Sequence, residues 1–170
     1  MFARIGNPIG KPIRPASLMR APLALVVACL CAVMPVPAQA GEACAPALAR
    51  QIEVGAQTFH IDIAANLRER ERGLSGRESL AAEKGMWFVF PSPGKHGFWM
   101  RDMSFPIDLI WVSPGRKVLG SMTLQPCTAM PCPIHLPPGP VSYVLEVNAG
   151  EFAGKAGDPV RWTCEPQPRK

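Results

Sequence analysis

The sequence lacks the short motifs that assign a chemistry directly. It has no glycine-rich phosphate-binding loop, no Gly-x-Ser-x-Gly nucleophile motif and no His-Glu-x-x-His zinc motif. It has no internal repeat, and its N-terminal apolar run over residues 21–33 is short for a membrane-spanning helix. These absences argue against a nucleotide-dependent enzyme, a serine hydrolase and a zinc peptidase.

Acidic residues are also absent from the first 40 residues, where four of the 18 basic residues lie. The basic segment, the apolar run and the small residues Ala38 and Ala40 follow in the order of a secretory signal peptide. We expect cleavage near Ala40 and a periplasmic or secreted protein without a membrane anchor after processing. Residues 41–170 would then form a single domain. The alternatives are an uncleaved anchor and a lipoprotein acylated at Cys29, which the mass of the mature N-terminus distinguishes.

Removal of the leader leaves a nearly balanced charge, with 14 basic and 13 acidic residues. The sequence therefore gives no reason to expect a nucleic-acid partner. Protein partners cannot be deduced from it.

Four cysteines follow the leader: Cys44, Cys127, Cys132 and Cys164. An even number in an exported chain favours disulfides, and four cysteines allow three pairings. Cys127 with Cys132 would close a local loop, and Cys44 with Cys164 would join the two ends of the domain; one bridge and two free thiols is the alternative. Thiolates at Cys127 and Cys132, with Met130 and His135, could bind Cu(I). Oxidation of the two cysteines to a disulfide would remove both thiolates. We expect no metal and no cofactor.

The rest of the chain alternates between short apolar segments and turns rich in glycine and proline, which is typical of a mainly β protein. We expect a compact antiparallel β-sandwich or barrel, jelly-roll-like, with one or two short helices. A helix is predicted over residues 66–72, between the cap Asn66 and Gly73, and a second helical turn could begin at Ser79. A turn is predicted at Pro91–Gly94, and strands are predicted at residues 52–54, 58–63, 86–90, 98–100, 107–112, 117–122, 141–147 and 160–162.

Residues 126–140 contain six prolines, which makes this segment stiff and unsuited to a central strand. It could form a pre-ordered rim beside a binding site. The alternative is a crossover loop that the cysteines hold in place.

Several segments in order along the chain resemble one known family. They are Glu69-Arg70-Glu71-Arg72-Gly73-Leu74, Gly85-Met86-Trp87-Phe88-Val89-Phe90, Phe98-Trp99-Met100-Arg101-Asp102-Met103, Pro106-Ile107-Asp108, Tyr143–Gly150 and Gly157-Asp158-Pro159-Val160. This pattern is similar to the DUF192 family, and the resemblance implies a compact β-sandwich or jelly-roll fold without an established activity. The chain departs from the family pattern at Ser75 and at Asp102-Met103, where Asp102 adds a carboxylate beside Arg101.

Two acids in apolar strands are the candidates for chemistry. Asp108 shares a strand face with Ile110 and Val112, and Glu146 shares one with Val144 and Asn148. A buried carboxylate is costly without partners, and arginine is the natural partner. We therefore predict a polar site for a small polar ligand or glycan, with Trp99 as its aromatic wall, made of Arg70, Arg77, Trp99, Arg101, Asp102, Asp108, Glu146 and Asn148.

This pattern leaves three interpretations open. We favour a binding or accessory role in the cell envelope over catalysis. The enzymatic alternative is a glycan hydrolase using Asp108 and Glu146, which requires carboxyl groups about 5–9.5 Å apart across a cleft. The third is a purely structural domain in which an ion-pair network with Arg72 and the other arginines joins the helix to the sheet.

Overall fold

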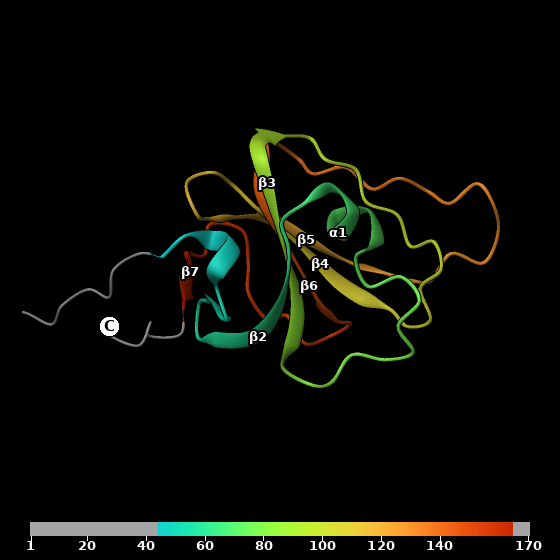
Figure 1. Cartoon of the computed structure of the whole chain (residues 1–170), viewed down its shortest axis with the longest axis horizontal. Helices are drawn as coiled ribbons and strands as arrows, with labels where there is room; N and C mark the ends of the chain where they lie inside the picture. Colours follow the sequence, from blue (N-terminus) through green and yellow to red (C-terminus); the bar gives the residue numbers. More distant parts are fainter. Residues whose placement is uncertain (1–43, 165–170) are drawn as a thin grey trace, which may run out of the picture. The chain divides into compact units, whose positions relative to one another are not determined.

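The computed structural model describes residues 44–164, which form one curled sheet with a short α-helix (Figure 1). The predicted leader, its cleavage site at Ala40 and Cys29 lie outside the described residues. The elements are η1 (Pro46–Leu48), β1 (Gln51–Val54), β2 (Gln57–Ala64), α1 (Leu67–Arg72), β3 (Lys84–Gly94), β4 (Ile107–Val112), β5 (Val118–Leu124), β6 (Val141–Asn148) and β7 (Val160–Thr163).

The strands are ordered β5-β4-β6-β3-β2-β1-β7 in the sheet. The mainly β prediction is confirmed, with one difference: β2 and β3 are parallel, whereas the other neighbours are antiparallel. Parallel neighbours need a crossover connection, and the segment with α1 supplies it. No helix in the described part of the chain is long and apolar enough to cross a membrane.

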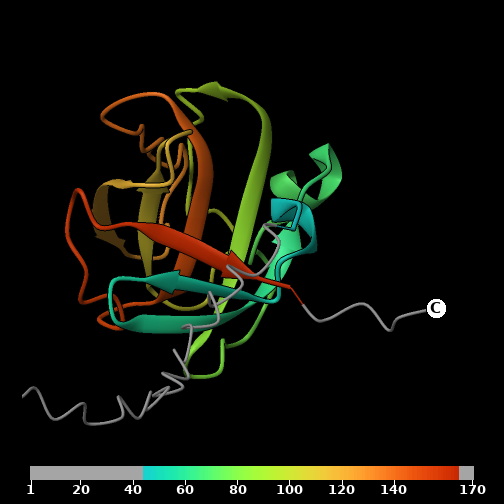
Figure 2. The same ribbon diagram turned by 90° about the vertical axis from the view of Figure 1, so that its left-hand side faces the viewer.

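The two edges of the sheet approach each other, so that the sheet curls into a half-barrel (Figure 2). Lys117, just before β5, forms a bridge with Pro159, just before β7. The amide of Val118 donates to the carbonyl of Asp158 over 3.0 Å. These contacts bring together two segments that are 40 residues apart in sequence, and they give the sheet a concave inner face.

Apolar side chains cover both faces of the sheet. The inner cluster takes residues from all seven strands, including Ile110 and Leu145. The outer cluster includes Leu109 and Val144, the next residues along the same strands. Because side chains alternate along a strand, β4 and β6 contribute to both clusters, and all six residues of β4 are buried.

The helix α1 is capped and ended by the two predicted residues, Asn66 and Gly73, and it begins one residue later than predicted. Asn66 accepts a hydrogen bond from the amide of Glu69, and the Glu69 carboxylate accepts one from the amide of Asn66, which forms a capping box. Hydrogen bonds from the Ala65 and Asn66 amides lower the pKa of Glu69. Gly73 ends the helix at φ +50° and ψ −134°, a conformation that only glycine adopts readily.

Three local predictions were wrong. Pro91–Gly94 is the end of β3, because Gly94 pairs with Val141 after a register shift. Residues 98–100 form no strand; only Phe98 makes a bridge, with His135. No helical turn begins at Ser79, since the carbonyls of the next two residues accept hydrogen bonds from the side chain of Asn148.

The structure contains two disulfides. Cys44 is joined to Cys164, with 6.2 Å between their Cα atoms, and this bond connects the two ends of the described domain. Cys127 is joined to Cys132, with 5.7 Å between their Cα atoms, and this bond closes a short loop in the proline-rich segment.

Candidate ligand-binding cavity

A cavity of about 320 Å³ lies on the outer face of the sheet, between α1, the end of β3 and residues 96–103. Most of its lining is apolar or aromatic, and it includes Leu67, Leu74, Phe88, Phe90, Phe98, Trp99, Met100 and Met103. The sheet contributes one acidic residue, Glu146 from β6. The other polar residues of the lining are Arg70, Glu71, Arg72, Ser75 and His96. Concave, largely apolar spaces of this size with few polar groups are typical of small-molecule sites.

The aromatic side chains of the cavity pack edge to face. Phe98 meets Phe88 with ring centroids 5.2 Å apart and an interplanar angle of 82°. It meets Phe90 at 6.2 Å and 83°. The ring of His96 stacks on the ring of Phe90, with ring centroids 3.8 Å apart. Such contacts fix ring orientations, so the wall is shaped before any ligand arrives.

Arg70 from α1 lines the cavity and also fastens the helix to β3. Its Nη1 donates to the carbonyl of Ala65 and, over 3.1 Å, to the carbonyl of Val89. Its guanidinium carbon lies 5.5 Å from the centre of the Phe90 ring. Arg70 therefore has a positioning role that is independent of any carboxylate partner.

Gly73 provides space beside the carboxyl group of the cavity. A Cβ atom at this position would lie 3.2 Å from Phe88 Cζ and 3.9 Å from Glu146 Oε2. The residue that ends α1 thus allows the helix to approach the aromatic wall and the acid closely.

Glu146 is buried, and its carboxyl group has no partner in the part of the chain that the structure describes. Its side chain is 6% exposed, and within residues 44–164 no donor reaches the carboxyl within hydrogen-bonding distance. Burial raises its pKa from 4.5 to about 8. At neutral pH the group is therefore protonated and uncharged, and it offers an O–H donor to the cavity.

Asp108 is equally buried but fully bonded. One carboxylate oxygen accepts from Thr123 Oγ1 at 2.6 Å. The other accepts from the amides of Gly150 at 2.8 Å and Phe152 at 3.1 Å. The predicted arginine partner was wrong: backbone amides and a hydroxyl satisfy this carboxylate, and it fixes the loop after β6.

The two acids do not face each other. Asp108 pairs across the strands with Val147, and Glu146 pairs with Leu109. Since residues directly opposite each other share a face, Asp108 lies on the inner face and Glu146 on the outer face. The hydrolase alternative requires both carboxyl groups across one cleft, and the sheet between them excludes that arrangement.

The remaining predicted site residues are dispersed. Arg77 forms an ion pair with Asp62 at 2.8 Å. Arg101 lies 3.6 Å from the Asp102 carboxylate, and its guanidinium carbon lies 5.2 Å from the centre of the Trp99 ring. The side-chain amide of Asn148 donates to Leu80, Ala81 and Glu151. Of the eight predicted residues, the cavity brings together Arg70, Trp99 and Glu146.

Of the aromatic and sulfur-containing wall of the cavity, the sequence analysis predicted Trp99 and missed the other residues. The spacing of Phe88 and Phe90 in β3 puts both on one face, but the same pattern also fits an ordinary core strand. A signal for the site was nevertheless present. Five aromatic residues lie between positions 87 and 99, and four of them, Phe88, Phe90, Phe98 and Trp99, line the cavity.

A family model settles the relationship of the chain to known proteins. The model for DUF192, described as "Uncharacterized ACR, COG1430", matches residues 50–162. The chain belongs to the DUF192 family. No curated protein matches the sequence.

Two crystal structures share the fold of this DUF192 protein. A protein of unknown function from Novosphingobium aromaticivorans DSM 12444 is 30% identical and superposes with a TM-score of 0.61; the match covers 66% of this chain and 84% of that one. A proposed transcription regulator from Sinorhizobium meliloti 1021 is 24% identical, with a TM-score of 0.59, and the match covers 66% of this chain and 92% of that one. The second likeness shows the fold alone.

Proposed function

We propose that this DUF192 protein is an exported, non-enzymatic binding domain of the cell envelope, whose outer cavity holds one small amphipathic molecule. The observation that carries the proposal is Glu146, a buried acid in the lining of an aromatic cavity, whose carboxyl group has no partner within residues 44–164. An unpartnered buried polar group lowers the stability of a fold, and such groups are concentrated at functional sites.

The chemistry of the cavity indicates the class of ligand. A protonated Glu146 donates a hydrogen bond, so the ligand presents an acceptor such as a carbonyl or amide oxygen. Phe88 and Phe98 offer apolar ring surfaces to the rest of the ligand. Apolar and aromatic residues outnumber the polar residues of the lining, which favours a ligand with an aromatic or short aliphatic body over a sugar.

Export is the second part of the proposal. The leader pattern and the two disulfides support an oxidising compartment outside the cytoplasm. Cell fractionation, with the mass of the mature N-terminus, tests this part. Full-length protein in the cytoplasm would contradict it.

An NMR titration tests the binding function. Benzamide offers a neutral acceptor and one ring, and we expect it to shift the amide signals of Gly73, Phe88 and Phe98 in the mature oxidised protein. Glu146→Leu, which removes the donor, should weaken this binding about tenfold or more, and Glu53→Gln on β1 is the matched control for loss of an acid away from the cavity. Glucose tests the glycan alternative. Shifts confined to other surfaces, or binding that is unaffected by Glu146→Leu, would refute the proposed site.

A further inference from the structure

We propose that the Cys127–Cys132 disulfide is a redox-modification site for a dithiol, and that its reduction releases one wall of the cavity. The effect on ligand binding rests on the proposed function, whereas the release of the wall stands on the contacts described below.

The wall formed by residues 96–103 is not a strand of the sheet, and the proline-rich segment holds its backbone. The amide of Phe98 donates to the carbonyl of His135 over 2.9 Å, and the amide of His135 donates back over 2.7 Å. The amide of Cys127 donates to the carbonyl of Met100 over 3.1 Å. Both ends of the segment between Cys127 and His135 are therefore attached to the wall, and Phe98 and Met100 line the cavity.

Side chains strengthen the same attachment. A Cβ atom at Gly97 would lie 2.6 Å from Cγ2 of Ile134 and 3.5 Å from Cδ2 of Leu136. The proline-rich segment thus packs directly against the backbone of the wall. This close approach depends on the path of the segment, which the disulfide constrains.

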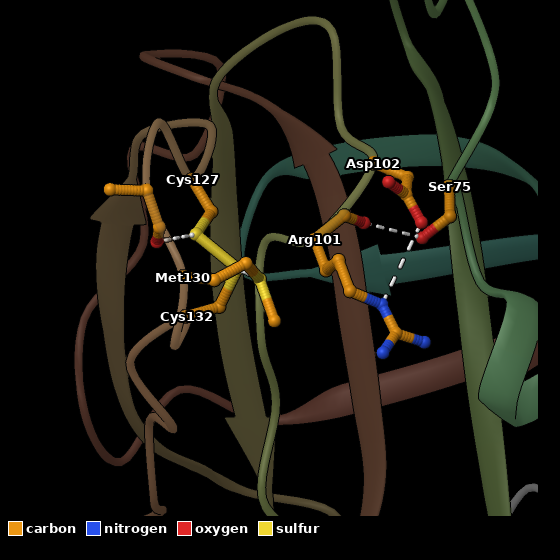
Figure 3. Close-up of a disulfide and its surroundings, with 7 residues drawn as sticks. Ser75, Arg101, Asp102, Cys127, Met130 and Cys132 are labelled. Carbon is orange, nitrogen blue, oxygen red and sulfur yellow. Dashed lines mark hydrogen bonds and ion pairs between the residues drawn. A yellow bond between two sulfur atoms is a disulfide. The ribbon is translucent and has the colours of Figure 1, made fainter.

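The other end of the wall is attached to the loop after α1. Ser75 Oγ donates to the carbonyl of Arg101 over 2.9 Å, and the amide of Gly76 donates to the carbonyl of Asp102 over 2.8 Å. Figure 3 shows the hydroxyl of Ser75 on Arg101 and, in the same view, the disulfide with Met130 beside it. Reduction would leave this attachment in place, so the wall would open at residues 97–100 and remain fixed at residues 101–102.

The disulfide is accessible to a reductant. Both cysteines are only partly buried, and the side chains of Met130 and Ile134 nearby are 70% and 62% exposed. A thiolate of the dithiol attacks one cysteine sulfur and forms a mixed disulfide. The second thiol of the reductant then displaces that sulfur, which leaves two cysteine thiols and an oxidised reductant. Two electrons and two protons pass to the protein, so the reaction is balanced.

The second disulfide provides a matched control. Cys44 packs against the inner cluster, and neither Cys44 nor Cys164 lines the cavity. Its loss should affect the ends of the domain and leave the wall as it is.

Hydrogen exchange tests the release of the wall. In Cys127→Ser/Cys132→Ser we expect the amides of Phe98 and His135 to exchange at least tenfold faster than in the oxidised wild type. The amide of Leu145 reports on the core and should keep its protection. Cys44→Ser/Cys164→Ser should leave the Phe98 and His135 amides unchanged. If the double serine variant does not fold, the Cys127–Cys132 disulfide of the wild type is reduced selectively, and mass spectrometry monitors the reduction. Hydrogen exchange in the reduced and oxidised wild type is then compared. Unchanged exchange at Phe98 and His135 would overturn the proposal.

Benzamide titration tests the effect on the site. Its Kd should rise at least fivefold when Cys127–Cys132 is absent and stay constant when Cys44–Cys164 is absent. Equal affinity with and without Cys127–Cys132 would overturn control of the cavity by redox state. If benzamide binds neither form, the proposed function fails, and the exchange result alone decides whether the disulfide holds the wall.

Discussion

Asp108 and Glu146 lie on adjacent strands and are buried to the same extent, yet their surroundings differ. Asp108 faces the inner side of the sheet and accepts three hydrogen bonds. Glu146 faces the outer side and has a raised pKa, about 8, because burial acts on it without compensation. Burial therefore does not assign a role to a carboxyl group. The hydrogen bonds that a buried carboxyl group makes indicate its role. Asp108 uses its hydrogen bonds to hold the fold together, whereas the carboxyl group of Glu146 is available to a ligand.

The largest effect expected from this comparison is at Glu146. Its folded-state pKa is raised, so the folded protein keeps a proton that the unfolded chain releases above pH 4.5. The contribution of Glu146 to the free energy of unfolding consequently falls by roughly 4–5 kcal/mol as pH rises from 4.5 to about 8, and it is level above pH 8. Glu146→Gln removes this loss.

Urea unfolding at pH 4, 6 and 8 measures the difference. We expect Glu146→Gln to match the wild type near pH 4 and to exceed its free energy of unfolding by roughly 4–5 kcal/mol at pH 8. Glu146→Leu also lacks the titrating group, so its free energy of unfolding relative to that of the wild type should rise with pH in the same way. A constant difference between wild type and Glu146→Gln across this range would show that Glu146 is ionised in the folded protein.

Asp108→Asn should lower the free energy of unfolding, whereas Glu146→Gln raises it. An asparagine has a single acceptor oxygen, and its NH₂ group would face the amides of Gly150 and Phe152 or the hydroxyl of Thr123. We expect a loss of about 2–4 kcal/mol at pH 7, or on the order of 10 °C in Tm. Thermal unfolding measures it. Asp62→Asn is the control, because its ion pair with Arg77 is largely exposed and should contribute less than about 1 kcal/mol. Equal losses in the two variants would contradict the structural role of Asp108.

Local signals in the sequence predicted much of the fold. The strand over residues 107–112 is found with the predicted bounds, and the helix differs by one residue, because alternation and capping are encoded within a few neighbouring positions. The parallel pairing of β2 with β3 could not be predicted in this way. It depends on contacts between residues that are distant in sequence, such as Ile63 and Trp87.

The same limit explains the misplaced site. Alternation correctly placed Asp108 with Ile110 and Glu146 with Val144 within each strand. Whether these two faces coincide depends on the register between β4 and β6, and a shift by one residue would reverse the answer. The observed register puts Leu109, not Asp108, opposite Glu146.

Thr123→Val removes one of the three bonds to Asp108 and keeps the shape of the side chain. Because this bond is made to a carboxylate, we expect a loss of about 1.5–3 kcal/mol, less than Asp108→Asn causes. In the Asp108→Asn background, Thr123→Val should lower the free energy of unfolding much less, because the hydrogen bond between the two side chains is already altered. A double-mutant cycle therefore isolates the interaction between Thr123 and Asp108. Additive losses would mean that Thr123 stabilises β5 without Asp108.

The last prediction concerns the ligand and the outer face. If the protonated form of Glu146 donates to a neutral acceptor, the affinity for benzamide should be level well below pH 8 and fall above it. With a pKa of about 8, roughly a tenth of the protein is protonated at pH 9, so Kd should rise about tenfold between pH 6 and pH 9, equivalent to about 1.4 kcal/mol. In Glu146→Gln, whose amide donates at every pH, the affinity should not change over this range. An NMR titration at pH 6, 8 and 9 measures both. Affinity for benzamide that rises with pH would instead indicate that an ionised Glu146 accepts a hydrogen bond from the NH₂ group of benzamide, and it would contradict the proposed donor role.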